Sequence, residues 1–204
     1  MSTSTGPVLV LLYYFLLVVL VQSAPVSSPL KEEADRAQTL VQKILKDLPT
    51  VHAAAVDTEG LTFDPQSQTA NLQLMEAELG IPQAPVLKPL SERFTLDVSL
   101  SRMWAGSQLY QGLLGDLSGR VSGLSDLRAD LRDLQAQIHK MSVSARTGAA
   151  TPPPPPAPDL ASRLHGNYEA QVAAHLTLTQ LRSHCHDLMR SLRGVAAYRP
   201  PATQ

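Results

Sequence analysis

The chain has 204 residues, of which 44% are hydrophobic and 17% are charged, and its formal net charge is −1. This balance argues against a nucleic-acid-binding surface and against a polybasic membrane surface. The sequence contains one cysteine, Cys185, so no disulfide can form within the chain, and an apolar core must hold the folded domain.

The first 23 residues are expected to form a signal peptide, which predicts a secreted, extracellular protein. Residues 8–21 are all apolar, and no charged side chain occurs before Lys31. This run is shorter than the roughly 20 residues of a membrane span and suits a signal-peptide core. Cleavage after Ser23 is preferred, because Val21 and Ser23 then occupy the two small-residue positions before the cut, and cleavage after Ala24 is second. An uncleaved anchor is the alternative, because no Lys or Arg precedes the apolar run.

The mature chain, residues 24–204, is expected to form one all-α domain with four long amphipathic helices. Apolar residues recur along it at spacings of three and four, which places them on one face of a helix. The predicted helices span about 29–55, 91–117, 122–145 and 159–195.

The first predicted helix has a start signal and an internal proline. Ser28 suits the N-cap, and Pro29 suits the first helical position. Pro49 lies within the apolar stripe. We expect it to kink or interrupt the helix, because proline lacks the backbone N–H and clashes with the preceding turn.

The loop lengths predict how the helices are connected. Roughly 35 residues separate the first two helices, and about 10 extended residues are enough to retrace a helix of that length. The stretch from Gly115 to Gly123 suits a tight reversal, whereas the proline-rich segment 147–158 suits a stiff, extended crossover. The order long, short, long predicts a left-handed four-helix bundle with up-up-down-down topology and two long crossover loops.

The first crossover is predicted to contain a short extra helix. Leu72, Met75 and Leu79 have helical spacing, and residues 80–82 read Gly-Ile-Pro. Glycine directly after the last helical turn, followed by an apolar residue and proline, is a signal for a helix C-terminus.

Two separated segments carry a family resemblance. Residues 79–85 read LGIPQAP and residues 108–114 read QLYQGLL. They resemble the granulocyte colony-stimulating factor family, in which an LGIP-x-AP segment ends the first crossover and LYQGLL lies in the second helix. The similarity is strong over residues 79–117, moderate to residue 141, and weak in the first helix and the proline-rich loop.

The resemblance implies a cytokine and its partners. The ligand of such a family is a monomer when free, and it binds a single-pass class I cytokine receptor in a complex of two ligands and two receptors. Its expected role is the growth and differentiation of granulocyte-lineage cells. The resemblance implies no cofactor, no metal, no nucleic acid and no insertion into a membrane.

The cysteines depart from the family pattern. Family members carry disulfides that pin the first crossover, one of them directly after the LGIP-x-AP segment, where residues 86–89 here contain no cysteine. Because a disulfide contributes about 2 to 4 kcal/mol, we expect a looser crossover and a less stable protein. The family's free cysteine aligns with Ala37, so Cys185 is not its counterpart. Cys185 lies on the apolar stripe of the last helix and is expected to be a buried free thiol, with pairing between chains as the alternative.

The third predicted helix carries a stripe of acidic residues. Asp126, Asp130 and Asp133 are spaced by four and three, which puts them on one face. The resemblance implies that Asp130 and Asp133 lie in the major receptor contact. The alternative is a solvated helix face on which Arg128 and Arg132 supply positive charge.

The first helix supplies the expected neighbours of that stripe. The resemblance places Gln42, Lys43 and Asp47 in the same major contact, and Thr39 aligns with a functional glutamate of the family. The departure at Thr39 implies that charge matching with the receptor differs in detail. Lys43 and Asp47 also form an ordinary i,i+4 ion pair, which is the alternative.

A second receptor contact is implied at the crossover and at the start of the fourth helix. Asn71 aligns with a functional glutamate of the family, and Leu164 lies near an exposed aromatic position. The alternatives are loop polarity for Asn71 and core packing for Leu164.

Other notable side chains have structural explanations. Trp104 and Tyr110 are expected to be core or half-buried packing residues. The His184-Cys185-His186 sequence does not predict a metal site, because residues two apart on a helix point in different directions.

Three alternatives remain: a second type of cytokine and two other classes of protein. Another interleukin-6-like long-chain cytokine would share the bundle and use a different receptor. A secreted lipid-binding protein also consists of amphipathic helices, but the unequal loops and the stiff crossover argue against it. An enzyme is least favoured, because the sequence has no G-x-S-x-G, H-E-x-x-H or phosphate-binding glycine loop.

Overall fold

The computed structural model describes residues 29–63, 70–145 and 159–199. Within these ranges the regular structure is helical, apart from one isolated bridge between Ser91 and Phe94. The signal peptide, the Ser28 cap and the proline-rich segment 147–158 lie outside the described residues. The elements are α2 (Pro29–Ala55), α3 (Ala70–Leu79), α4 (Leu96–Leu117), α5 (Ser125–Ser144), the 3₁₀ turn η2 (Ala161–Arg163) and α6 (Asn167–Ala196).

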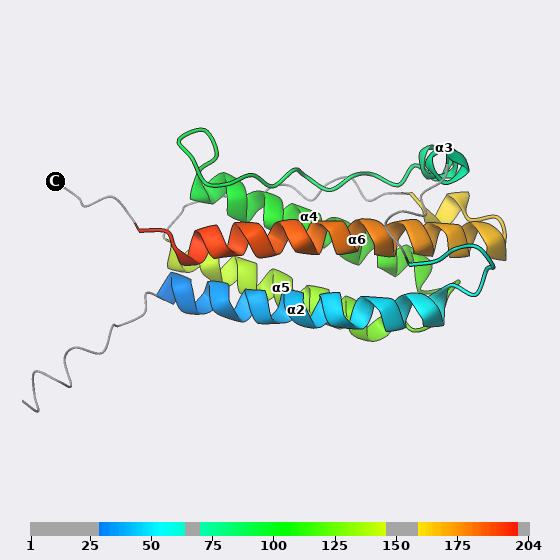
Figure 1. The fold of residues 1–204 in the computed structure, drawn as a ribbon, viewed down its shortest axis with the longest axis horizontal. Helices are drawn as coiled ribbons and strands as arrows, with labels where there is room; N and C mark the ends of the chain where they lie inside the picture. The colour runs from blue at the N-terminus through cyan, green and yellow to red at the C-terminus, as the bar shows by residue number, and fades with distance from the viewer. Residues whose placement is uncertain (1–28, 64–69, 146–158, 200–204) are drawn as a thin grey trace, which may run out of the picture.

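The four long helices form a bundle. Both α2 and α4 pack against α5 and against α6, and the short α3 packs against α6. Figure 1 shows the four long helices side by side, with α3 at one end of the bundle. In the part of the chain that the structure describes, no helix combines the length and the apolarity needed to cross a membrane.

Three helix starts differ from the predicted ones. The second long helix begins at Leu96 and not near residue 91, because Thr95 caps it by accepting a hydrogen bond from the Val98 backbone N–H at 3.5 Å. The third begins at Ser125, just after Gly123 with its φ of 80°. The fourth begins at Asn167 and not near residue 159, because Gly166 is fully extended and ends the irregular segment before it.

Pro49 does not interrupt α2, so the interruption, one of the two outcomes predicted for this proline, does not occur. The helix runs unbroken from Pro29 to Ala55 with Pro49 inside it. Leu48 and His52 are buried on either side of the exposed proline. Their packing on the bundle stabilises the helical path beyond the turn that proline disfavours.

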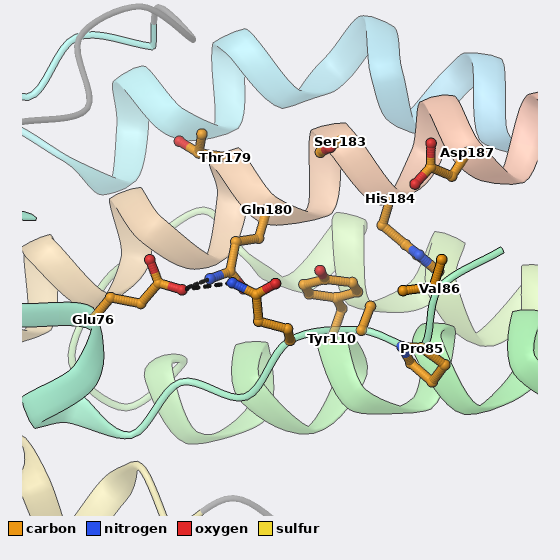
Figure 2. Close-up of a pocket in the computed structure, with 11 residues that line it drawn as sticks. Glu76, Pro85, Val86, Tyr110, Thr179, Gln180, Ser183, His184 and Asp187 are labelled. Carbon is orange, nitrogen blue, oxygen red and sulfur yellow. Dashed lines mark hydrogen bonds between the residues drawn. The ribbon is translucent and has the colours of Figure 1, made fainter. Parts of the chain in front are cut away.

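The predicted short helix between the first two long helices is confirmed as α3. Gly80 follows its last residue with a φ of 62°, the left-handed conformation of a C-terminal stop. The chain then runs along the bundle beside α4 and α6 through Pro85 and Val86 (Figure 2). Arg102 of α4 holds it there by donating from Nη1 to the Val86 carbonyl at 2.8 Å.

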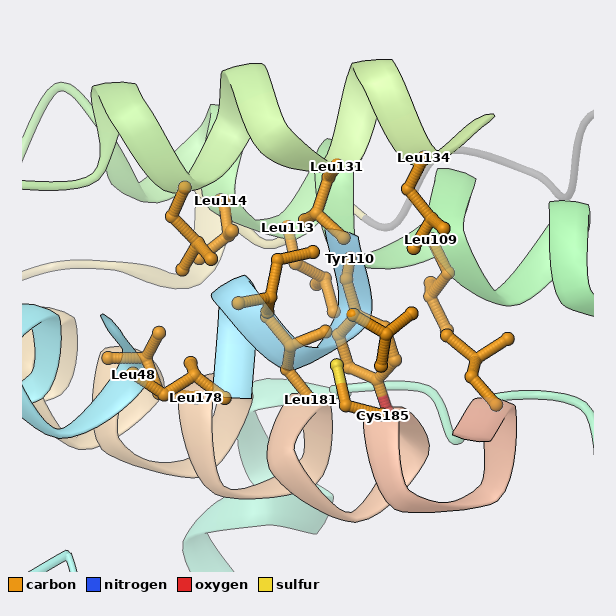
Figure 3. Close-up of a cluster of buried hydrophobic side chains, with 14 of the residues drawn as sticks. Leu48, Leu109, Tyr110, Leu113, Leu114, Leu131, Leu134, Leu178, Leu181 and Cys185 are labelled. Atoms are coloured by element: carbon orange, nitrogen blue, oxygen red, sulfur yellow. The ribbon is translucent and has the colours of Figure 1, made fainter. Parts of the chain in front are cut away.

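The core consists of the apolar stripes that the sequence predicts. Tyr110 is 2% exposed, Trp104 is half-buried and Cys185 is a buried free thiol, so the three predictions of their burial are confirmed. Figure 3 shows the centre of this core, where all four long helices contribute side chains. Its fully buried leucines include Leu48, Leu113, Leu114, Leu131, Leu134, Leu178 and Leu181.

Candidate functional site

The face shared by α2 and α5 holds an ion-paired cluster. Lys43 of α2 reaches across to the Asp130 carboxylate of α5, and its Nζ lies 3.5 Å from Asp47 one turn along α2. The Asp130 side chain is 13% exposed, whereas that of Lys43 is 52% exposed. The sequence placed these three residues in one contact, and the structure brings them together.

The electrostatics of the cluster follow from this geometry. The hydrogen bond to Asp130 raises the pKa of Lys43 above its ordinary value, and the charges of Asp130 and Asp47 act in the same direction. Lys43 is therefore positively charged at neutral pH. Two carboxylates share this one cation, so the three side chains together carry net negative charge, and Lys43 is the most exposed of them.

A groove lies beside the cluster, between the second half of α2 and the start of α5. Its volume is about 280 Å³, and it is lined by residues that include Asp47, Asp126 and Asp130. The half-buried Val51 and the buried Leu127 contribute apolar surface to it. An acidic rim with an apolar base can receive a side chain that has an aliphatic stem and a cationic head.

The remaining residues predicted for this contact are exposed on the same two helices. Gln42 and Asp133 present their side chains to solvent. Thr39 is also exposed, and its hydroxyl donates to the Asp35 carbonyl at 3.1 Å, as helical threonines commonly do. Arg128 donates from Nη1 to the Ser118 hydroxyl at 3.3 Å, so this arginine points to the end of α4.

The second predicted contact is only partly exposed. Asn71 lies on α3 with its side chain in solvent. Leu164 is 3% exposed and belongs to the core, which favours the packing alternative for this residue. Sequence reasoning missed Tyr168 in the first turn of α6, which is 50% exposed. No pattern in the sequence separates it from the buried Leu164 four residues earlier, so its exposure was not predictable.

The described residues contain no cluster of three or more histidine, cysteine or acidic side chains that could hold a metal ion. His184 is buried and His186 is exposed, so these two imidazoles lie on different sides of α6.

Comparison with known proteins adds no family assignment. No protein-family model matches this chain, and no curated protein matches it.

Proposed function

We propose that the chain is a secreted helical cytokine that binds and dimerises a class I receptor of the granulocyte colony-stimulating factor type. Its role would be to promote proliferation and differentiation of granulocyte-lineage cells. The observation that carries this proposal is the joint acidic face of α2 and α5, where Lys43 and Asp47 meet Asp130. The family resemblance implies a receptor contact on these two helices, and this face has the charge and the groove to make one.

The proposal includes an up-up-down-down topology. Figure 1 supports it: the colour gradients of α2 and α4 run in one direction along the bundle, and those of α5 and α6 run in the other. Only seven residues, 118–124, separate α4 from α5, as a tight reversal requires. The connections before α4 and before α6 are long enough to cross the bundle from end to end.

The acidic face favours a basic receptor surface. Asp130 is largely removed from water, so a receptor arginine or lysine that displaces Lys43 would form a shielded pair with it. Asp126 and Asp133 are exposed and would mainly accelerate encounter with a positively charged surface. Because both side chains are negative and lie on one face of α5, they direct a positively charged surface to that face.

A second receptor contact would use the end of the bundle where α3 packs against α6. Asn71 is exposed on α3, and Tyr168 offers a half-exposed ring at the start of α6. Tyrosine is enriched among residues that dominate binding energy at interfaces. Two contacts on different faces are what a ligand needs to bring two receptors together.

The burial pattern disfavours the lipid-binding alternative. The apolar faces of the four long helices are buried against one another. The large hydrophobic side chains that are exposed in the described ranges are scattered over four elements: Leu74, Val86, Val143 and Tyr168. A lipid-binding helix needs a continuous apolar face, so binding to lipid would require the bundle to open. The other interleukin-6-like cytokines remain the alternative, and the identity of the receptor distinguishes them.

Receptor-dependent signalling tests the proposal. The mature chain should cause receptor phosphorylation and proliferation in cells that carry the granulocyte colony-stimulating factor receptor of the same species. Matched cells without the receptor should not respond. An equal response in both lines, or no response to a helical and monomeric preparation, would contradict the receptor assignment. Activity on cells that carry a different class I receptor would support the interleukin-6-like alternative.

A further inference from the structure

The segment that follows α2, residues 56–63, turns back across α6 (Figure 1). Three side chains of α6 hold this segment and the last turn of α2: Gln171, His175 and Arg182. Their spacing of four and seven residues places them on one face of α6. These contacts include no residue of the acidic cluster on α2 and α5, so they are separate from the proposed receptor contact.

At one end of the segment, Gln171 accepts three hydrogen bonds. Its Oε1 accepts from the backbone N–H of Asp57 at 3.1 Å, from that of Thr58 at 2.8 Å, and from the Thr58 hydroxyl. An amide side chain does not titrate where histidine does. These bonds therefore report whether the segment is attached, and they do not themselves respond to mild acid.

At the other end, Phe63 covers a buried histidine of α2. The rings of Phe63 and His52 have their centroids 4.8 Å apart. The Arg182 guanidinium lies 5.1 Å from the Phe63 ring, and its Nη1 donates to the Phe63 carbonyl at 3.3 Å. Phe63 is half-buried, so a movement of this residue away from α6 would give water access to His52.

Two buried imidazoles join α2 to α6 beneath this segment. His52 Nε2 and His175 Nδ1 lie 2.9 Å apart, and the two residues are 5% and 3% exposed. A hydrogen bond between imidazole nitrogens needs one donor and one acceptor, which two neutral rings supply. Two protonated rings would place donor against donor, so the contact cannot survive protonation of both.

No carboxylate compensates a positive charge on the pair. Within the ranges that the structure describes, no ion pair includes either imidazole. The segment contributes Asp57 and Glu59, which are exposed, and α6 contributes the positive Arg182 over Phe63. The negative end of the α2 dipole favours a charge on His52, but burial outweighs it and lowers the pKa of His52 to about 4. Burial also lowers the pKa of His175.

The pair can reach water without unfolding the bundle. His52 lies in the last turn of α2, three residues before the helix ends at Ala55. The fully buried leucines at the centre of the bundle lie outside the covering segment. His184 differs, because it packs on Gly106 of α4 inside the bundle and has no such cover that can lift away.

We propose that His52 and His175 form an acid-sensitive clasp, and that protonation of this pair releases residues 56–63 from α6 while the four-helix bundle stays folded. The open state binds protons that the closed state excludes, so opening increases as the pH falls from about 6.5 toward 4. Each histidine that takes up a proton on opening raises the ratio of open to closed molecules about tenfold per pH unit in this window. The inference goes beyond the receptor proposal and does not depend on it.

Amide hydrogen exchange of the mature ¹⁵N-labelled chain, followed by NMR between pH 7 and 5, tests the clasp. Exchange rates are divided by the intrinsic rate at each pH. Below pH 6.5 the Thr58 amide should lose about ten- to hundredfold of its protection per pH unit, because one or two histidines are protonated on opening. It should also stay less protected than the Leu131 amide of α5, because the opening is local. Protection at Thr58 that is independent of pH, or equal to that at Leu131, would overturn the inference.

Glutamine variants assign the effect to the pair. Glutamine is neutral over this range and can both donate and accept, so His52→Gln/His175→Gln should make the protection of Thr58 independent of pH. His165→Gln/His186→Gln removes two exposed imidazoles and should keep the parent's pH dependence. If the first double variant does not fold, His175→Gln alone should reduce the loss to about tenfold per pH unit. An unreduced pH dependence in the variants of the pair would contradict the clasp.

Discussion

Lowering the pH from 7 to 4 is expected to reduce the free energy of unfolding by several kcal/mol, because three buried histidines are neutral in the folded chain. His52, His175 and His184 are each at most 5% exposed. His52 Nε2 and His175 Nδ1 lie 2.9 Å apart between α2 and α6. Burial, together with the charge of the neighbouring His175, lowers the pKa of His52 to about 4. Burial alone lowers the pKa of His175, and it lowers the pKa of His184 to about 4.

The direction of the effect follows from proton binding. In the unfolded chain these imidazoles titrate near pH 6.5, whereas in the folded chain the pKa values of His52 and His184 are about 4 and that of His175 is also lowered by burial. Between these values the unfolded state binds more protons, so stability falls as the pH falls. The neutral histidines contribute fully to the free energy of unfolding above pH 6.5. This contribution falls as the pH falls, and the loss levels off below about pH 4. For His184 alone this amounts to about 3 kcal/mol.

Urea unfolding followed by circular dichroism at pH 7.5, 6, 5 and 4 measures this dependence. His184→Gln removes one of the groups and should flatten the curve relative to the parent. His186→Gln changes an exposed imidazole in the same turn and is the matched control. If His184→Gln does not fold, His52→Gln replaces it. Parallel curves for the parent, the buried-site variant and the control would contradict the assignment of the pH dependence to the buried histidines.

The same substitution at two glycines of α4 is expected to have opposite effects. A Cβ added at Gly106 would lie 2.5 Å from His184 Nε2, with Cε1 of the same ring closer still. The imidazole is buried and cannot simply swing into solvent. Gly106→Ala should therefore destabilise the bundle by about 1 to 3 kcal/mol, as overpacking of a core does.

Gly112 provides the contrast within the same helix. Nothing lies within 4 Å of a Cβ added there, and the residue is exposed. Gly112→Ala should stabilise the protein by about 0.5 to 1 kcal/mol, because alanine favours the helix. Thermal or urea unfolding of the two variants measures the difference. A stabilising effect of Gly106→Ala would show that α4 and α6 are not packed as closely at His184 as described, and a destabilising effect of Gly112→Ala would contradict the open space at that position.

Sequence periodicity was sufficient to predict the long helices and the faces that they bury. Leu131, Leu134 and Leu178 are buried where the three-and-four spacing put them, because that spacing places them on one face of a helix. The helix starts were harder to predict. Thr95 caps the start of α4 with its side chain, and the extended backbone of Gly166 ends the irregular segment before α6. These local effects decide where each helix begins, whatever the apolar spacing of the flanking residues.

Contacts between distant parts of the chain were only partly predictable. The acidic stripe on α5 followed from spacing, but the link from Lys43 to Asp130 spans 87 positions and depends on how α2 packs against α5. The hydrogen bond from Gln180 to Glu76 was not predicted, because these two residues meet only when α3 packs against α6. Leu164 and Tyr168 had no distinguishing pattern, since η2 and the turn before α6 decide which of them faces the core.

Binding of the mature chain to the immobilised ectodomain of the granulocyte colony-stimulating factor receptor from the same species tests the central claim most directly. We expect tight binding by the parent and a loss of about 2 kcal/mol, or about 30-fold, in the Asp130→Asn/Asp133→Asn double variant. Glu92→Gln/Asp159→Asn removes the same charge from two exposed positions outside α2 and α5, and it should bind as the parent does. No binding by a helical, monomeric parent, or an equal loss in both double variants, would contradict the account.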